Sequence, residues 1–287
     1  MSDIVIRRAT PRDKRAVNDI CRRIGGDGDY LPDVFAEWVR DRRGGLWVAS
    51  IGDRVVGVAK LTLLGEREAW LHALRVDPRY RRRGVATALV AHRLERAKRL
   101  GARVARLDTG DDNIAVQRLM RRFRFHRVGR YSFWRRTAQV GPLPRRAVAT
   151  EVATLKRLAR TGDSILHERF VRRTLGREDL ARAIRRGDCL IAGPPGRPQA
   201  MAIVERTSSP AGTRKGPALE RLRVVHLAGA GRGLRELVAA LPAEARRRGL
   251  PRAGITAGAR YWAALRAARY HRPWSGAMLL FEKRLDE

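Results

Sequence analysis

Residues 70–87 read WLHALRVDPRYRRRGVAT and join an apolar strand to a helix through a basic turn. The first amides of a helix have no partners inside the helix, and the helix dipole adds partial positive charge there. Gly84 and Ala86 are small enough to let a diphosphate approach these amides, and the arginines at 81–83 add charge. The stretch therefore predicts an anion-binding site at the N-terminus of a helix.

The segments around this stretch predict one α/β unit. Apolar alternation and turn residues indicate an antiparallel meander, and apolar residues at helical spacing indicate the helices that flank it. We expect a hairpin around Gly129, near the end of the unit. The expected strands are 4–8, 46–50, 54–64, 69–76 and 104–107, and the expected later helices are 85–100 and 113–123.

The second half of the chain repeats this order of elements. Strands are expected at 189–192, 199–206, 221–227, 252–256 and 277–283, and helices at 233–248 and 259–268. The segments 123–128 and 268–273 also resemble each other, at an offset of 145 residues. An offset near half the chain length suggests duplication. With a linker rich in proline and glycine at 139–147, the sequence predicts domains at 1–138 and 148–287.

The chain has 287 residues and a formal net charge of +33. Such a charge favours polyanions such as RNA, DNA or anionic membranes. Arginine occurs in nearly every segment, however, so an arginine bias of the whole organism explains the excess as well as a binding face does. Aromatic residues, which stack on bases, make up only 6% of the chain. Both interpretations of the charge stay open at this stage, and nucleic acid remains a candidate partner.

Other bulk features indicate a cytoplasmic protein. Cys21 and Cys189 are the only cysteines, which are too few for a disulfide framework. The first residues lack the pattern of a signal peptide, and no run approaches the roughly 18 apolar residues of a membrane span. We expect neither a membrane partner nor a metal site, and the sequence leaves the oligomeric state open.

The basic turn resembles the acyl-CoA-binding motif of GNAT acetyltransferases, in which an arginine or glutamine precedes a glycine and then a glycine or alanine. Here these residues are Arg81, Gly84 and Ala86. The resemblance covers residues 4 to about 135. It implies a mixed α/β (α+β) fold with tandem GNAT-like domains, each a mainly antiparallel sheet flanked by helices, and it implies acetyl-CoA as the cofactor. The residues implied to bind the cofactor are Leu74, Arg75, Val76, Arg81, Arg82, Arg83, Gly84, Val85, Ala86, Thr87 and Asn113.

Two residues depart from the family pattern. Many members carry a tyrosine seven residues after the asparagine and use it to protonate the departing thiolate, but Met120 stands at this position. The glycine that is usual near the end of that helix is Arg124. Because a thioether cannot donate a proton, either another group, with Tyr131 as the candidate, or water protonates the thiolate.

Amide formation requires a neutral amine, so the site requires a general base. Period-two alternation places Trp70, His72 and Leu74 on one face of their strand, which lets His72 face the acceptor. Histidine titrates in the useful range of pH. The alternative for His72 is a buried structural imidazole, and Glu68, on the same face, is the reserve candidate for the base.

The segment from Asp29 to Pro32, followed by Trp38, resembles the acceptor-side helix pair of the histidine N-acetyltransferase-like branch. This resemblance implies that Asp29, Tyr30 and Trp38 line the acceptor pocket, and that the acceptor is a small molecule or an amino acid. The alternative is a helix connection with aromatic core residues.

Together these features predict an N-acetyltransferase that transfers an acetyl group from acetyl-CoA to a primary amine by direct attack. Two alternatives stay open: an acetyltransferase of a protein or nucleic-acid-associated amine, and a basic nucleic-acid-binding module with a decayed transferase site. The second half carries glycines at 229–233 near the equivalent corner, but it lacks the arginine-first spacing. We therefore expect a degenerate second domain and one active site per chain.

Overall fold

The computed structural model describes residues 4–65, 67–163, 165–168, 171–210 and 218–286. Within these ranges a sheet of twelve strands runs through the molecule in the order β1-β2-β3-β4-β5-β14-β6-β13-β12-β11-β10-β7, and β8 and β9 form a separate ribbon. The strands are β1 (Ile4–Arg8), β2 (Gly45–Ile51), β3 (Arg54–Leu64), β4 (Glu68–Val76), β5 (Val104–Gly110), β6 (His126–Thr137), β7 (Arg145–Arg146), β8 (Ile165–Glu168), β9 (Val171–Thr174), β10 (Cys189–Ala192), β11 (Ala200–Pro210), β12 (Ala218–Gly229), β13 (Arg252–Gly258) and β14 (Met278–Arg284).

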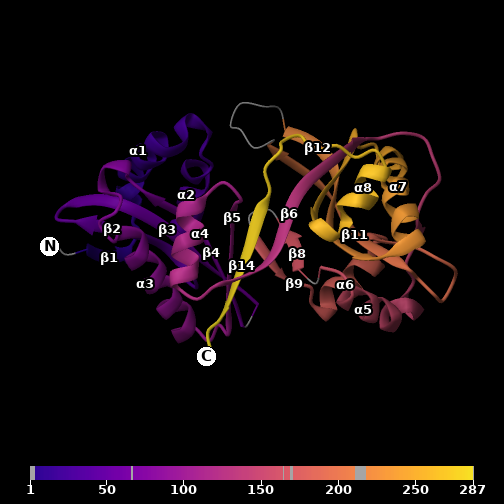
Figure 1. The fold of residues 1–287 in the computed structure, drawn as a ribbon, viewed down its shortest axis with the longest axis horizontal. Helices are drawn as coiled ribbons and strands as arrows, with labels where there is room; N and C mark the ends of the chain where they lie inside the picture. The colour runs from indigo at the N-terminus through magenta and orange to yellow at the C-terminus, as the bar shows by residue number, and fades with distance from the viewer. Residues whose placement is uncertain (1–3, 66, 164, 169–170, 211–217, 287) are drawn as a thin grey trace.

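Helices cover both faces of the large sheet (Figure 1). In the first half, α3 and α4 pack on one face and α1 and α2 on the other, and each pair encloses its own apolar core. In the second half, α7 and α8 cover one face and α5 and α6 the other. The expected mixed, mainly antiparallel sheet flanked by helices is confirmed. The helices are α1 (Lys14–Gly25), α2 (Leu31–Arg40), α3 (Val85–Arg99), α4 (Ile114–Arg122), α5 (Val152–Arg160), α6 (Arg177–Arg185), α7 (Gly231–Arg247) and α8 (Trp262–Ala267).

The two halves pair their strands in the same way but share one sheet. Strands β1 to β4 are antiparallel neighbours and β5 is parallel to β4; β7, β10, β11 and β12 are likewise antiparallel, and β13 is parallel to β12. The last strand, β14, lies between β5 and β6, and β6 pairs with β13 on its other edge (Figure 1). The expectation of a separate sheet for each half is therefore wrong. The division at 139–147 stays a proposal, and this segment contains β7.

The expected hairpin around Gly129 is also wrong. β6 runs as one strand from His126 to Thr137, with β14 along its first part and β13 along its second. A Cβ atom at Gly129 would lie 2.4 Å from Cε2 of Tyr131. The glycine makes room for this aromatic ring, and it does not turn the chain.

The two segments that resemble each other in sequence also share a conformation. Arg124 and Arg269 both follow a helix and both lie in the left-handed region, with φ of 58° and 57°. The next amide in each case donates to a carbonyl five residues earlier, from Phe125 to Met120 at 3.0 Å and from Tyr270 to Leu265 at 2.9 Å. Arginine at position 124 thus adopts the backbone for which the family pattern has glycine.

β4 contains a bulge, and the prediction that His72 and Leu74 share one face of this strand is therefore wrong. The register with β3 shifts near Ala73, whose φ is 53°. His72 contacts α2, and Ala73 belongs to the core under α1 and α2, whereas Leu74 packs with the core under α3. Leu74 therefore lies on the opposite face from His72, because a bulge adds a residue and breaks the period of two.

Each parallel strand pair separates after a short run of pairing. β4 and β5 pair only from Glu68 to Trp70 on the β4 side. β12 and β13 pair only from Leu222 to Val224 on the β12 side. Beyond these residues a gap opens between the strands of each pair, and the candidate site lies at the first gap.

The lengths of the helices and the positions of the two cysteines can be compared with what the composition predicts. In the part of the chain that the structure describes, no helix is both long and apolar enough to cross a membrane. Cys21 and Cys189 are buried and free, and they belong to different core clusters, so no disulfide links them.

Candidate active site

A cavity of about 770 Å³ opens at the N-terminus of α3, where the sequence predicts an anion site. Of the predicted cofactor residues, all but Arg83 line it; Arg83 instead lies over the ring of Tyr80, 5.3 Å from its centroid. We call this the outer cavity. Its predicted lining residues are Leu74, Arg75, Val76, Arg81, Arg82, Gly84, Val85, Ala86, Thr87 and Asn113.

Glycines shape this corner at two positions. Gly84 is the N-cap of α3 and has φ of 84°, and a Cβ atom there would meet only Cδ1 of Ile4, at 3.7 Å. The space in front of the first helical amides is therefore open. Gly57 in β3 lies under the start of α3, where a Cβ atom would be 2.9 Å from Cγ1 of Val85. The helix consequently sits close on the sheet, with its positive end beside the gap between β4 and β5.

A second cavity of about 440 Å³, the inner cavity, adjoins the outer cavity. Asn113 lies between them as the N-cap of α4, and its side chain accepts a hydrogen bond from the amide of Val116 at 3.3 Å. The residues that line both cavities are Tyr30, Leu74, Arg75, Asn113 and Val116. A ligand anchored at α3 can therefore extend past the bulge of β4 into the inner cavity.

The inner cavity is built from both halves of the chain. Its first wall comes from β4, β5 and α4, and its other walls come from β9, β12 and β13. Arg172 of β9 donates to Asp108 of β5 at 2.9 Å, and this ion pair joins the ribbon to the first half. The lining residues from the second half are Val171, Arg172, Arg223, Val224, Thr256 and Met278.

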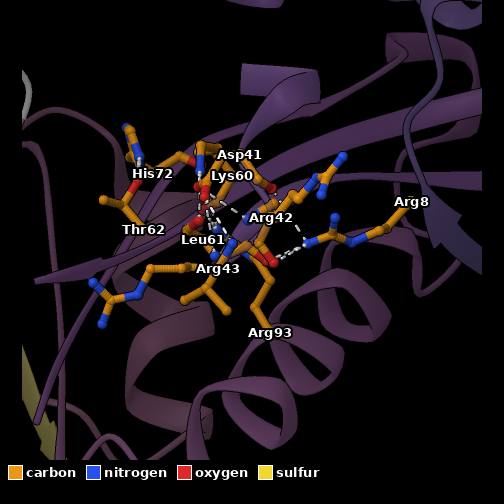
Figure 2. A network of polar contacts seen from close by, with 11 residues as sticks. Arg8, Asp41, Arg42, Arg43, Lys60, Leu61, Thr62, His72 and Arg93 are labelled. Atoms are coloured by element: carbon orange, nitrogen blue, oxygen red, sulfur yellow. Dashed lines mark hydrogen bonds and ion pairs between the residues drawn. The ribbon is translucent and has the colours of Figure 1, made fainter. Parts of the chain in front are cut away.

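His72 lies in the wall of the inner cavity at the bulge of β4. Its Nε2 is 2.9 Å from Oγ1 of Thr62, and its ring meets the edge of Trp38 with 4.8 Å between the centroids. Figure 2 shows His72 beside Thr62 in this network. Nδ1 of His72 is buried and has no hydrogen-bond partner among the described residues. One ring nitrogen is thus held by the protein, and the other is left without a partner among the described residues.

Positive charge surrounds the imidazole. Arg93 of α3 is 2% exposed, and its guanidinium donates to the carbonyls of Lys60 at 3.1 Å and His72 at 3.3 Å (Figure 2). Burial lowers the pKa of Arg93 to about 9. Burial, and then the charges of Lys60, Arg93 and Arg75, hold the pKa of His72 well below its usual 6.5, with a small opposing effect of Asp41. His72 is therefore neutral at neutral pH.

The three predicted acceptor residues lie on different sides of this site. Asp29 is buried and pairs with Arg75 at 2.7 Å, so it fixes a wall and leaves no free carboxylate. Tyr30 lines both cavities, and Arg75 lies 5.7 Å from the centroid of its ring. Trp38 is buried against Tyr30 and His72 and lines neither cavity. The structure brings Tyr30 to the site and uses Asp29 and Trp38 to support it.

Glu68 and Tyr131, the other predicted catalytic residues, line neither cavity. Glu68 pairs with Arg106 at 2.9 Å and accepts a hydrogen bond from the amide of Thr174 at 3.0 Å. Tyr131 is 4% exposed and lies under Arg172, and burial raises the pKa of its hydroxyl to about 12. Neither residue is placed to exchange a proton with a ligand in the inner cavity.

Several lining residues were not predicted from the sequence. Met120, identified as a departure from the family pattern, lines the inner cavity. Arg93 is an arginine inside a helix, where its side chain would be expected to lie in solvent. Arg172 and Arg223 are distant in sequence from the basic turn at 81–86, and no local pattern distinguishes them from the other arginines.

Comparison with known proteins supports an acetyltransferase fold. Residues 15–125 match the sequence model of the acetyltransferase (GNAT) family. N-acetyltransferase 8B of Rattus norvegicus is 30% identical over 106 residues, and N-acetyltransferase 8 of Homo sapiens is 32% identical over 108 residues. These matches cover 35% and 36% of this chain and 48% of each relative, so the chain spans about half the length of the curated relatives that it matches.

A solved structure extends the likeness in fold to the second half. The GCN5-related N-acetyltransferase from Sphaerobacter thermophilus superposes with a TM-score of 0.66 at 16% sequence identity, over 98% of this chain and 96% of that one. The residues that match the family model include the gap between β4 and β5, the bulge of β4 and the start of α3. Over residues 15–125 the chain is therefore similar in sequence to the acetyltransferase (GNAT) family.

Proposed function

We propose that this protein is an N-acetyltransferase that transfers an acetyl group from acetyl-CoA to the primary amine of a small molecule or an amino acid. The observation that carries the proposal is the junction of two cavities at the bulge of β4. The outer cavity offers helical amides and arginines to a diphosphate, and the inner cavity offers an unpartnered imidazole nitrogen. A molecule with an anion at one end and a reactive thioester at the other fits this arrangement.

The residues of the outer cavity fit the phosphate end of acetyl-CoA. The amides of Val85 to Thr87, at the start of α3, donate to the diphosphate, and Arg81 and Arg82 add charge. Gly84 leaves the approach open. When bound, acetyl-CoA supplies an acyl thioester whose carbonyl carbon is open to attack by an amine.

The backbone of β4 orients and polarises the acyl group. Beyond Trp70, β4 has separated from β5, so the backbone groups that point toward β5 have no strand partner. An amide between Leu74 and Val76 is thereby free to donate to the acyl carbonyl oxygen. A fixed donor at this oxygen stabilises the negative charge that develops there during attack.

His72 accepts the proton from the amine at Nδ1. Its low pKa keeps the imidazole unprotonated at neutral pH, which is the form that a base requires. The positive charges of Arg93, Arg75 and Lys60 also disfavour an ammonium ion in the cavity, so they favour the neutral amine. Met120 donates no proton, and Tyr131 lies outside the cavity, so we assign protonation of the departing thiolate to water.

The test is release of free CoA from acetyl-CoA with a panel of primary amines, with mass spectrometry of the acetylated products. His72→Gln should lower kcat/KM by about 100-fold, the lower end of the effect of general-base catalysis. Because the pKa of His72 is lowered, the acid limb of kcat/KM in the unmodified protein should lie below pH 6.5.

The matched control is His92→Gln, on α3 and outside both cavities, which should turn over at the normal rate. Absence of CoA release with every amine would contradict the proposed function. Equal rates in the two histidine variants would contradict the role of His72.

A further inference from the structure

The inner cavity extends far beyond His72. Its lining includes residues of β4 at one end and of β12 at the other. Four strands, β5, β14, β6 and β13, lie between β4 and β12 in the sheet. Because neighbouring strands are about 4.8 Å apart, the five spacings from β4 to β12 amount to about 24 Å along the sheet, and the side chains that project into the cavity shorten this span. This span exceeds the length of a free α-amino acid.

The β12 end of the cavity is rich in arginine. Arg223 lines the cavity, and burial and then the charges of the nearby Arg223 and Arg252 lower the pKa of Arg221. Glu205 forms an ion pair with Arg223, and its negative charge acts in the opposite direction, toward a higher pKa of Arg221. Among the described residues that act on the pKa of Arg221, two are arginines and one is a carboxylate, so an anion would restore the balance of charge.

The arginines at this end also have unused donors. Nε of Arg221 and Nε of Arg223 are both buried, and neither has a hydrogen-bond partner among the described residues. Arg221 lies over the ring of Phe133, 5.3 Å from its centroid, which fixes its guanidinium on the sheet. A buried donor without a partner is costly, and a ligand that accepts its hydrogen bond removes this cost.

The β4 end of the cavity also carries positive charge. Arg93 lines it, and among the described residues its guanidinium donates to backbone carbonyls and pairs with no carboxylate. A second cationic group on the acceptor, as in a diamine, would therefore be repelled from this cavity. An anionic group on the acceptor would be attracted along it.

We infer that the acceptor is an elongated primary amine with an anionic group, a carboxylate or a phosphate, at its far end. The amine lies at His72, and Arg223 of the second half binds the anion. This inference rests on the proposed function and assigns the second half a direct part in the choice of acceptor.

The experiment measures kcat/KM for a series of ω-amino carboxylates of increasing length. The series is compared at each length with the alkylamine, the diamine and the ω-aminoalkyl phosphate. At one chain length well beyond that of an α-amino acid, kcat/KM for an anionic amine should be at least 10-fold higher than kcat/KM for the alkylamine of the same length. The diamine should be the poorest acceptor. The carboxylate and phosphate arms show which anion the arginines prefer.

Variants then locate the anion. Arg223→Gln should reduce the ratio of the anionic amine to the alkylamine at least 5-fold, and Arg223→Lys should restore part of it. The control is Arg206→Gln on the neighbouring strand β11, where the arginine is 61% exposed and pairs with Glu220; its ratio should be normal.

Turnover of alkylamines with no preference for an anion at any length would overturn this inference and leave the proposed function standing. A preference that survives unchanged in Arg223→Gln would also overturn it. Absence of CoA release with every amine and in every variant would overturn both.

Discussion

The gap between β4 and β5 and the gap between β12 and β13 both follow a short parallel pairing, but they differ in what occupies them. The first gap is the junction of the outer and inner cavities. At the second gap, the hydroxyl of Tyr261 donates to the carbonyl of Leu227 at 2.9 Å and accepts a hydrogen bond from the amide of Asp163 at 3.3 Å. Gly162 lies so close that a Cβ atom there would be 2.6 Å from Cβ of Ala228. The second gap is therefore filled by the chain itself.

This difference shows that the fold alone does not make a site. Both halves separate a parallel strand pair beside a helix N-terminus, and both have a glycine with positive φ at that corner, Gly84 and Gly231. The first half leaves its strand edge open and surrounds it with arginines and His72. The second half satisfies its strand edge with a tyrosine and contributes Arg172 and Arg223 to the cavity of the first half.

The largest expected effect comes from a negative charge at each corner. Gly84→Glu should weaken acetyl-CoA binding at least about 100-fold, or ~2.7 kcal/mol, because the carboxylate repels the diphosphate from the helical amides. Gly231→Glu is the matched control, since a Cβ atom at Gly231 meets nothing within 4 Å and its corner has no assigned ligand. The measurement is the rate of CoA release at subsaturating acetyl-CoA. Equal losses in the two variants would contradict a difference between the gaps.

The second prediction concerns His226, which lies in β12 as His72 lies in β4. Burial lowers the pKa of His226 to about 4, and neither ring nitrogen has a partner among the described residues. Because its pKa is lower in the folded than in the unfolded state, stability is lost as pH falls below about 6.5. At pH 5 this loss is about 2 kcal/mol relative to pH 7.5.

Urea unfolding at the two pH values checks the loss. His226→Leu should abolish this part of the pH dependence, whereas the exposed His126→Gln should retain it. An unchanged pH dependence in His226→Leu would show that this histidine is not a buried neutral group.

The third prediction concerns Arg93, which supports the bulge at the open gap. Arg93→Met leaves the carbonyls of Lys60 and His72 without a donor, and the protein should lose about 1.5 kcal/mol of stability. The acid limb of kcat/KM should also move to higher pH, because His72 loses a neighbouring cation that lowers its pKa.

The control for Arg93 is Arg99→Met on the same helix, where the arginine is 68% exposed. It should change neither the urea midpoint nor the pH profile. A stability loss in Arg93→Met without a shift of the acid limb would contradict the electrostatic link to His72.

The smallest effect is expected at the filled gap. Tyr261→Phe retains the ring but leaves the carbonyl of Leu227 and the amide of Asp163 without their partner, which should cost about 1 kcal/mol of stability. Acetyl-CoA affinity should be unchanged, because the proposed cofactor site lies in the other half. A change in affinity larger than twofold would link the second gap to the cofactor.

The structure of the corner at the start of α3, which we propose as the cofactor site, could be predicted from the sequence because its parts are local. The strand, the turn and the start of α3 lie within 18 consecutive residues, 70–87, and Asn113 follows in the next strand–helix connection. Helical amides and a glycine in the left-handed region are properties of the chain itself, so they follow from spacing. The sheet class and most strands could be predicted for the same reason.

The acceptor side could not be predicted in the same way. Alternation places Leu74 beside His72, but the bulge at Ala73 moves Leu74 to the other face. Arg172 and Arg223 reach the inner cavity because β14, from the second half, pairs with β5 and β6 of the first half. The spacing of residues in the sequence does not indicate this pairing. The ribbon of β8 and β9 was not predicted either, since its strands are only four residues long.

The most direct test of one open and one filled gap is a calorimetric titration of the protein with acetyl-CoA. We expect one binding site per chain, which is lost in Gly84→Glu and retained in Gly231→Glu. Two sites per chain, or a site that survives Gly84→Glu, would contradict this expectation.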